Sequence, residues 1–443
     1  MRKLPFVAGV LALMGILLGT ALPGAAAPAA GTPPAPIVLK AARVFTATSE
    51  RPLAPGMVIV QGDRITQVGQ SLAVPPGAQV IDLGDATLLP GFIDAHVHLD
   101  MEMSDDWYRD FYQDIMRFPA EQAHYAALYA KRTLEAGFTT VRDVGSVDYV
   151  SLGLRNAINA GVTEGPRMLI ANYAISSTGG HADQAPFPPE RVKPAGPIQG
   201  VCNGPEECRA AVRYQIKYGA DVIKFMPSGG VLSLADPVDV PELTQEEMNA
   251  VVSEAHAWHR KVAAHCHGDA AAKMAIKAGV DSIEHGSFLQ DDTLRLMKEK
   301  GVYLVPTIFA GYWVGEKADH FPPAIAAKAR AAAAQIQSMF QHAVRIGVKV
   351  GFGTDSAVEP HGLDAQEFAL MVKNGMSPAQ ALLAATAADA DLLGLADKIG
   401  TLETNKLADL VAVPGDPLMD IRQTEKVFFV MQGGKVIKDQ VGH

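Results

Sequence analysis

The sequence is short of positive charge, of cysteine and of long apolar runs, and each shortage argues against a class of protein. Its 38 lysines and arginines are outnumbered by 48 aspartates and glutamates, giving a formal net charge of −10 at pH 7. Such an acidic chain is a poor partner for nucleic acid or for anionic membranes. The apolar run from Phe6 to Leu18 is too short for a comfortable transmembrane helix, and no cysteine follows it to carry a lipid anchor.

The first 31 residues have the pattern of a secretory signal peptide. Arg2 and Lys3 precede the apolar run, and small residues follow it through Ala30. Cleavage after Ala29 is preferred to cleavage after Ala27, because a proline directly after Ala27 disfavours the cut there. We therefore expect residues 1–31 to be a signal peptide and flexible start, and the mature protein to be periplasmic or secreted. An uncleaved anchor is the alternative interpretation.

Only three cysteines occur in the chain. Cys202 and Cys208 flank a short turn, and an exported location permits a disulfide between them, although the spacing also suits two free thiols. Cys266 lies between two histidines of the candidate site. We interpret it as a small buried residue rather than a nucleophile.

The sequence after the signal peptide predicts an α/β protein built on a (β/α)8 TIM barrel. A length of 443 residues suits a barrel of about 250 to 400 residues with a small attached domain, and 48% hydrophobic residues support a large core. Strand-like and helix-like segments alternate from 89 to 399, which is the pattern of a parallel sheet. The eight predicted strands are those around His96 and at 140–144, 168–174, 222–226, 262–265, 282–285, 303–307 and 350–354.

Segments that alternate apolar and polar residues open and close the sequence. They lie at 37–45, 56–69 and 79–83, and again at 407–413 and 426–431, between turns rich in Gly and Pro. We expect residues 32–88 and 400–443 to build one small β-sandwich domain from both chain ends. Residues 89–399 would then form the barrel.

Six residues of metal-binding or catalytic character stand at the ends of predicted strands. His96 and His98 alternate along one strand, so both imidazoles point to the same side and can bind one ion. A (β/α)8 barrel brings the C-terminal ends of its strands to one rim, so residues far apart in sequence can meet there. The pattern therefore predicts a two-metal hydrolase site, and its six members are His96, His98, Lys224, His265, His285 and Asp355.

The chemistry of this set suits Zn²⁺ and similar ions. Neutral imidazoles and carboxylates are their usual ligands, and two such ions can act together in hydrolysis. Lysine is a poor ligand, because an ordinary pKa of about 10.4 leaves it protonated. Lys224 follows two apolar residues, which makes exposure unfavourable, but a salt-bridged lysine is the alternative interpretation.

The order of these residues, HxH, Lys, His, His and Asp, resembles the amidohydrolase superfamily. The resemblance implies that Lys224 is carboxylated by CO₂ and bridges two divalent ions, that His96, His98 and Asp355 hold one ion, and that His265 and His285 hold the other. It also implies a homo-oligomer. Further motifs resemble the Xaa-Pro dipeptidase-like and carboxypeptidase-like branch, which includes ochratoxinases; these motifs lie at 139–145, 177–181, 223–230, 264–268 and 282–286.

Other residues are candidates for substrate binding. His267 lies on the same side of its strand as His265, so either could bind metal, and the resemblance favours His265 as the ligand and leaves His267 for substrate. His181 follows two glycines and either contacts substrate or supports its loop. Arg142 either binds a substrate carboxylate or forms a structural ion pair. Val231 and Leu232 either line the substrate cavity or seal the barrel.

The activity implied by this resemblance is hydrolysis of an amide bond. Asp355 and Lys224 are the expected catalytic residues; Asp355 would shuttle a proton to the leaving nitrogen, or it could merely orient another ligand. The expected substrates are dipeptides or N-acyl amino acids with a free carboxylate, with ochratoxin A as a specific candidate. A cyclic amidase of the imidazolonepropionase type or a deaminase is the alternative. A non-catalytic binding protein would lack ligands, and none is missing from the sequence.

Overall fold

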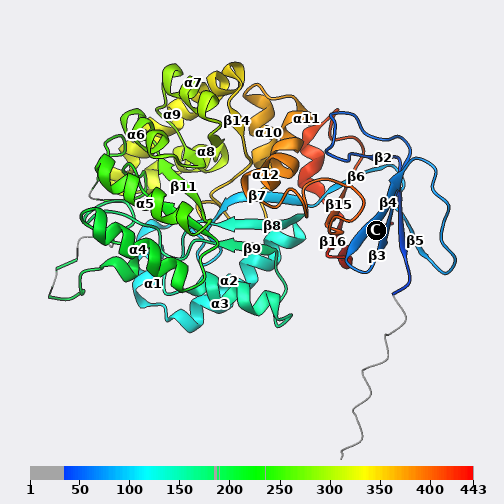
Figure 1. Ribbon diagram of the computed structural model, residues 1–443, viewed down its shortest axis with the longest axis horizontal. Helices are drawn as coiled ribbons and strands as arrows, with labels where there is room; N and C mark the ends of the chain where they lie inside the picture. The colour runs from blue at the N-terminus through cyan, green and yellow to red at the C-terminus, as the bar shows by residue number, and fades with distance from the viewer. Residues whose placement is uncertain (1–33, 184–186, 189, 235, 443) are drawn as a thin grey trace, which may run out of the picture. The chain divides into compact units, whose positions relative to one another are not determined.

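Eight parallel strands form a barrel in the computed structural model, which describes residues 34–183, 187–188, 190–234 and 236–442 (Figure 1). Three of them form one ladder in the order β7-β8-β9, and five form another in the order β10-β11-β12-β13-β14. The barrel strands are β7 (Phe92–Val97), β8 (Phe138–Asp143), β9 (Arg167–Ile170), β10 (Val222–Phe225), β11 (Lys261–Cys266), β12 (Ser282–His285), β13 (Tyr303–Val305) and β14 (Lys349–Val350).

Short contacts join the two ladders into a closed ring. After β9 the chain leaves its ladder, and Ile175 then pairs in parallel with Phe225 of β10. On the other side the segment after β14 runs along β7, where the Ala95 amide donates to the Phe352 carbonyl and Val97 pairs with Ser356. The predicted barrel is confirmed, although the predicted strands 168–174 and 350–354 are longer than β9 and β14.

Helices connect and surround the barrel strands (Figure 1). Thr244 begins α5 through a reciprocal pair of hydrogen bonds with Glu247, and Ser377 begins α11 in the same way with Gln380. No helix of the described residues is long and apolar enough to span a bilayer. The helices are α1 (Trp107–Met116), α2 (Pro119–Glu135), α3 (Val150–Asn159), α4 (Pro205–Lys217), α5 (Gln245–Ala257), α6 (Asp269–Ala278), α7 (Asp291–Lys300), α8 (Ile308–Glu316), α9 (Pro323–Ile346), α10 (Gln366–Lys373), α11 (Pro378–Leu383) and α12 (Asp389–Leu392).

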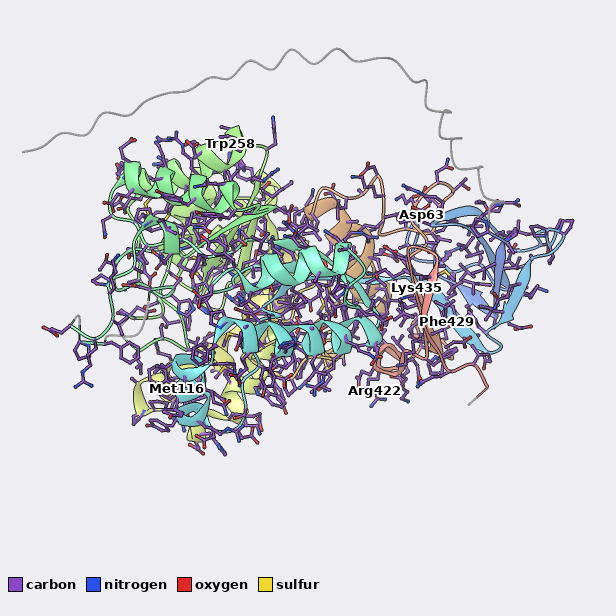
Figure 2. All side chains as sticks on the ribbon, turned by 90° about the horizontal axis from the view of Figure 1, so that it is seen from below. Asp63, Met116, Trp258, Arg422, Phe429 and Lys435 are labelled. Carbon is purple, nitrogen blue, oxygen red and sulfur yellow. A yellow bond between two sulfur atoms is a disulfide. The ribbon has the colours of Figure 1, made fainter. Side chains whose placement is uncertain are left out.

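Both chain ends contribute to a pair of smaller sheets beside the barrel. One sheet has the order β4-β3-β1-β5, and the other, β17-β16-β15-β6-β2, pairs N-terminal with C-terminal strands (Figure 1). Phe429 of β16, labelled in Figure 2, is fully buried in the apolar cluster that both sheets share. The strands are β1 (Ile37–Ala41), β2 (Arg43–Val44), β3 (Gly56–Gln61), β4 (Arg64–Gly69), β5 (Gln79–Asp82), β6 (Ala86–Pro90), β15 (Leu410–Pro414), β16 (Phe429–Gln432) and β17 (Lys435–Asp439).

These sheets lead directly into the barrel. Only Gly91 separates β6 from β7, and a Cβ there would lie 2.2 Å from the Thr139 hydroxyl, so glycine lets the two elements approach closely. The described residues from 35 to 442 pack as one compact unit. The boundaries 32–88, 89–399 and 400–443 stay predictions, and the predicted signal peptide lies outside the described residues.

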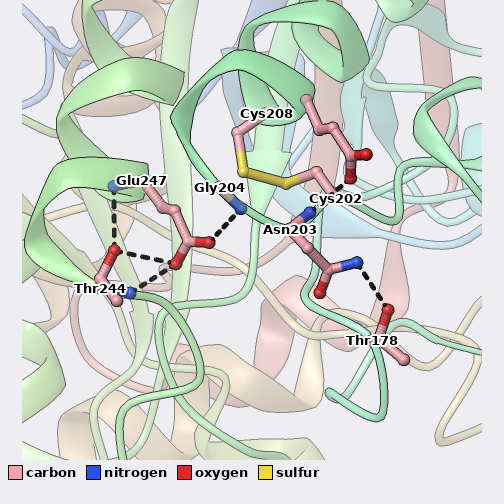
Figure 3. Close-up of a disulfide and its surroundings, with 8 residues drawn as sticks. Thr178, Cys202, Asn203, Gly204, Cys208, Thr244 and Glu247 are labelled. Atoms are coloured by element: carbon pink, nitrogen blue, oxygen red, sulfur yellow. Dashed lines mark hydrogen bonds between the residues drawn. A yellow bond between two sulfur atoms is a disulfide. The ribbon is translucent and has the colours of Figure 1, made fainter.

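A disulfide joins Cys202 and Cys208, whose Cα atoms lie 5.0 Å apart (Figure 3). The loop it closes is tied to its surroundings by two hydrogen bonds: the Gly204 amide donates to Glu247 at the start of α5, and the Asn203 side chain donates to the Thr178 hydroxyl. Thr178 also lines a cavity beside the candidate site. The disulfide loop therefore connects α4, α5 and one wall of that cavity.

Candidate active site

The six predicted metal ligands converge at the C-terminal ends of the barrel strands. The His96 Nε2 atom lies 3.3 Å from the Lys224 Nζ atom and 3.3 Å from an Asp355 carboxylate oxygen. The His98 Nε2 atom lies 3.4 Å from the same oxygen. Residues from β7, β10 and the segment after β14 meet here because parallel strands of a barrel end at one rim.

Two histidines complete the set from neighbouring strands. The His265 ring centroid, on β11, lies 4.6 Å from that of His285, on β12, and the His285 centroid lies 4.8 Å from that of His96. His267 also approaches: ligand atoms of His265, His267 and His285 lie within 4.8 Å of one another, as do those of His96, His285 and Asp355. Two adjacent donor groups therefore share His285.

Hydrogen bonds at Nδ1 fix three of these imidazole rings. A carbonyl oxygen only accepts, so the His98 Nδ1 must donate to Gly145, and its Nε2 atom is left to face the cluster. The same arrangement at the other two rings leaves their Nε2 atoms toward the cluster as well. The Nδ1 partners are Glu284 for His96 at 2.8 Å, the Gly145 carbonyl for His98 at 2.7 Å and Thr307 for His285 at 2.7 Å.

The donor set fits divalent metal ions. The Nε2 atom of His265 is buried and has no hydrogen-bond partner among the described residues, which is costly unless a further group binds it. Burial lowers the pKa of His265 and of His285 well below the ordinary value, so both imidazoles are neutral, as metal ligands must be. The oriented rings and this unpaired nitrogen are consistent with metal binding at the rim.

The backbone adopts an unusual conformation at two of these residues. His285 and Asp355 each have φ near 68°, in the left-handed region that residues other than glycine seldom adopt. His285 is the last residue of β12, so this conformation ends that strand. Gly353 permits the close approach of two strands, because a Cβ at that position would lie 2.9 Å from the His96 Cβ.

Lys224 is buried at the centre of the cluster, with 1% of its surface exposed. Burial lowers its pKa to about 8, although the carboxylates of Glu284 and Asp355 oppose the shift. At pH 7 roughly a tenth of such lysines are neutral, against far fewer for an ordinary lysine. A larger fraction of Lys224 is therefore in the neutral form, the only form of an amine that can act as a nucleophile.

Asp355 is held in its charged form. Burial by itself would raise its pKa, but the neighbouring His96 and His98 outweigh this effect and hold the pKa well below the ordinary value. Its side chain keeps 17% of its surface exposed. Asp355 can therefore face a cation with its charged carboxylate while part of its side chain remains exposed to the cavity.

The prediction that Arg142 binds substrate is wrong. Its side chain is 1% exposed inside the barrel, and its Nη2 atom donates to both carboxylate oxygens of Glu284 at 2.9 and 3.0 Å. Further donors reach the Ser282 hydroxyl at 3.1 Å and the Ala95 carbonyl. The guanidinium is thus committed to a structural ion pair, the alternative that the sequence left open, and it lines none of the cavities described below.

The other predicted substrate residues lie around the cluster. His181, whose ring centroid is 4.4 Å from that of His265, lines a cavity of about 60 Å³ together with Val231, Leu232 and His267. A Cβ on Gly230 would lie 2.0 Å from the His181 ring, so glycine makes room for it. The ring centroids of His265 and His267 lie 4.6 and 4.9 Å from that of His285, so the division of the pair into ligand and substrate contact stays a prediction.

Sequence reasoning missed the side chains that support the cluster. Glu284 is fully buried, accepts from His96 and pairs with Arg142, while Ser287 bonds the His267 Nδ1 atom at 2.9 Å. Burial by itself would raise the Glu284 pKa, but the Arg142 charge and the His96 hydrogen bond lower it to about 2. A signal existed: Arg142 and Glu284 are charged residues inside segments predicted to be strands of the barrel, where a buried charge needs a partner.

Comparison with known proteins places the chain in a family. The sequence model of the amidohydrolase family matches residues 87–441. Ochratoxinase from Aspergillus niger is 35% identical over 370 residues, which cover 79% of this chain and 75% of the relative.

Two solved structures extend this likeness to three dimensions. A Xaa-Pro dipeptidase with bound methionine superposes with a TM-score of 0.88 at 40% identity, over 91% of this chain and 100% of the other. A prolidase in complex with N-methylphosphonate-L-proline gives a TM-score of 0.84 at 30% identity, over the same shares of the two chains. With its barrel and its histidine-rich rim, this chain belongs to the amidohydrolase family and is a metal-dependent amidohydrolase.

Proposed function

We propose that this protein hydrolyses the amide bond of dipeptides or N-acyl amino acids that carry a free carboxylate on the leaving side. The observation that carries the proposal is the convergence of all six expected ligands on one rim, in a chain similar to a Xaa-Pro dipeptidase and to a prolidase. Ochratoxin A is a specific candidate substrate, supported by 35% identity to an ochratoxinase. Its amide joins an aromatic acyl group to phenylalanine.

The proposed cofactor is a pair of divalent ions, with Zn²⁺ as the first candidate. His96, His98 and Asp355 would hold one ion, and His265 and His285 the other. When bound, such ions would lower the pKa of a water molecule and polarise the amide carbonyl.

Lys224 would bridge the two sites as a carbamate. The neutral amine nitrogen forms a bond to the carbon of CO₂ and releases one proton to solvent, which leaves a carboxylate on the side chain. The lowered pKa of Lys224 supports this step, because only the neutral amine can attack CO₂.

The side chains around the rim would handle the proton and the substrate. Asp355 is charged at neutral pH, so it can take a proton from the attacking water and deliver it to the leaving nitrogen. Burial lowers the pKa of His267 to about 3 and that of His181 to about 4, so each neutral ring can hydrogen-bond a polar group of the substrate. Val231 and Leu232 would form the apolar wall.

Two further proposals concern the setting of the enzyme. The pattern of residues 1–31 supports export to the periplasm or outside the cell, where a disulfide is stable. A homo-oligomer is proposed from the family resemblance alone.

A substrate screen tests the activity. Purified protein is incubated with N-acyl derivatives of Phe, Pro, Arg and Lys, with dipeptides and with ochratoxin A, and the products are followed by mass spectrometry. Hydantoins, dihydroorotate, imidazolonepropionate and nucleobases form the opposing panel. They represent the cyclic amidase and deaminase alternatives, of which the first is favoured by 26% identity to the imidazolonepropionase of Cutibacterium acnes. Turnover confined to the opposing panel would replace the proposal.

Metal analysis of the same preparation tests the cofactor. About two divalent ions per chain are expected. One ion per chain at full activity would contradict the two-metal assignment.

A further inference from the structure

Two cavities open beside the metal-ligand cluster. One, of about 440 Å³, includes His181 and Trp107 in its wall, and the other, of about 490 Å³, includes His98 and Tyr173. Each is large enough for one part of a dipeptide-sized substrate. The residues that line both cavities are Met101, Asp114, Arg117 and His181.

Arg117 differs in charge from its surroundings. Among the described residues it is the only lysine or arginine that lines either cavity. Several wall residues are carboxylates, among them Glu102, Asp110 and Asp236. A negatively charged group is therefore repelled along much of the wall and attracted at Arg117.

The guanidinium of Arg117 is fixed in position without losing its charge. It donates from Nη2 to the Gln113 amide oxygen at 3.0 Å and from Nη1 to the Gln122 amide oxygen at 3.2 Å, and both acceptors are neutral. Its Cζ atom lies 4.3 Å from the centre of the Tyr125 ring. The Glu121 carboxylate, half exposed to solvent, lies 3.7 Å from its Nε atom. Asp114, which lines both cavities, is a second acidic neighbour: burial raises the pKa of Asp114 to about 6, and the Arg117 charge opposes that shift. Each Nη atom keeps a second N–H, so the guanidinium can still donate two hydrogen bonds to a carboxylate.

The backbone also limits where Arg117 can move. It directly follows Met116, the last residue of α1, which Figure 2 labels, and its amide donates to the Gln113 carbonyl at 2.8 Å. Pro119 then begins α2, so the guanidinium is carried by the short connection between two helices. Its side chain is 14% exposed. A cation held this way is preorganised for one ligand position.

We propose that Arg117 binds the free carboxylate of the leaving amino acid and so determines the preference for substrates with a charged C-terminus. This role is the one first expected of Arg142, which lies inside the barrel instead. The inference rests on the function proposed above. It adds the residue that recognises the carboxylate.

The test compares an acid substrate with its C-terminal amide. Ala-Phe and N-benzoyl-Phe are offered to the wild type, and the faster one is then compared with its amide. We expect Arg117→Met to lower kcat/KM for the acid by about 10- to 100-fold, the usual loss for a charge-assisted bidentate contact. The amide, which lacks the negative charge, should be cleaved by the variant at close to the wild-type rate. Most of the loss for the acid should appear in KM.

The matched control is Arg109→Met. Arg109 is on α1, the helix that Arg117 directly follows; it is 58% exposed and lines neither cavity, so this variant removes an equal charge and should keep the wild-type ratio of acid to amide. Arg117→Lys keeps the positive charge but loses the paired N–H donors of the guanidinium. Its ratio of kcat/KM for the acid to kcat/KM for the amide should fall between those of the wild type and Arg117→Met. A wild-type ratio in either Arg117 variant would overturn the inference. A wild type that does not itself prefer the acid would instead refute the proposed free-carboxylate substrate.

Discussion

Arg142→Met tests the ion pair that supports the candidate metal site. The Arg142 and Glu284 side chains are 1% and 0% exposed, so water cannot replace the lost guanidinium. Methionine fills much of the same volume but leaves the Glu284 carboxylate unpaired. The His96 ring is oriented by its hydrogen bond to Glu284. If Glu284 moves after losing its partner, the His96 imidazole should be held less firmly in the orientation that metal binding needs.

The expected magnitude follows from the pKa of Glu284. Although burial opposes it, the Arg142 charge and the His96 hydrogen bond lower this pKa from 4.5 to about 2, which corresponds to roughly 3 kcal/mol of stabilisation of the charged form at about 1.4 kcal/mol per pH unit. Removing one partner of a buried pair typically costs about 3 to 5 kcal/mol. We therefore expect Arg142→Met to lower the apparent free energy of unfolding by about 3 kcal/mol or more.

The pH dependence gives a second check with a defined sign. The folded-state pKa of Glu284 is depressed, so its contribution to stability is present above pH 4.5 and is lost as the pH falls toward 2. The difference between the wild type and Arg142→Met should therefore be largest at neutral pH. It should shrink as the pH falls from 4.5, where Glu284 of the unfolded chain takes up a proton, toward about 2, where Glu284 of the folded wild type does so as well.

Urea denaturation followed by circular dichroism measures the effect, with metal content measured on the same samples. A double variant with Glu284→Gln should recover part of the loss, because it removes the unpaired charge. The control is Arg422→Met, whose guanidinium is 70% exposed and whose residue Figure 2 labels; its ion pair with Asp420 lies in solvent, so its loss should leave the free energy of unfolding close to that of the wild type. Arg142→Met within about 1 kcal/mol of the wild type, or a double variant with the summed loss, would refute the reasoning.

Three further predictions concern the metal cluster and the disulfide. Lys224→Ala should lose most metal and activity, with partial rescue by short acids in high bicarbonate; wild-type metal content and rate would exclude a bridging role. His265→Ala should lose metal, whereas His267→Ala should keep it and lose turnover or change substrate preference; metal content and kcat/KM measured side by side would show whether the two roles are reversed. Cys202→Ser opens a loop of about seven residues and should cost roughly 2 kcal/mol of stability in urea denaturation, and an unchanged midpoint would argue against any structural role for the bond to Cys208.

The position of the candidate ligands at strand ends could be predicted from the sequence. His96, Lys224 and His285 each follow or end an apolar strand segment, and the barrel geometry carries every such position to the same rim. The composite sheet was predictable for a similar reason, because alternating segments at both chain ends need partners for their apolar faces. Local pattern is enough in these cases because each property depends on residues adjacent in the sequence.

The role of Arg142 depended on the three-dimensional contacts. From its strand the Arg142 side chain could have reached either the cavity or the barrel interior. It lies in the interior because its ion-pair partner there is Glu284, 142 positions further along the chain. The place of Arg117 in the walls of both cavities could likewise not be predicted from the sequence, where it is an arginine two positions before a proline. Its environment depends on loops that meet only after folding.

The sequence by itself determined the barrel and the composite sheet and placed the six candidate ligands at strand ends, because hydrophobic periodicity fixes which positions end a strand and residue type fixes what chemistry they carry. The tertiary structure alone decided which charges pair and which face the cavity. The reason is electrostatic: a buried charge is tolerated only beside its partner, and the partner's distance is a property of the packed chain, not of the local sequence.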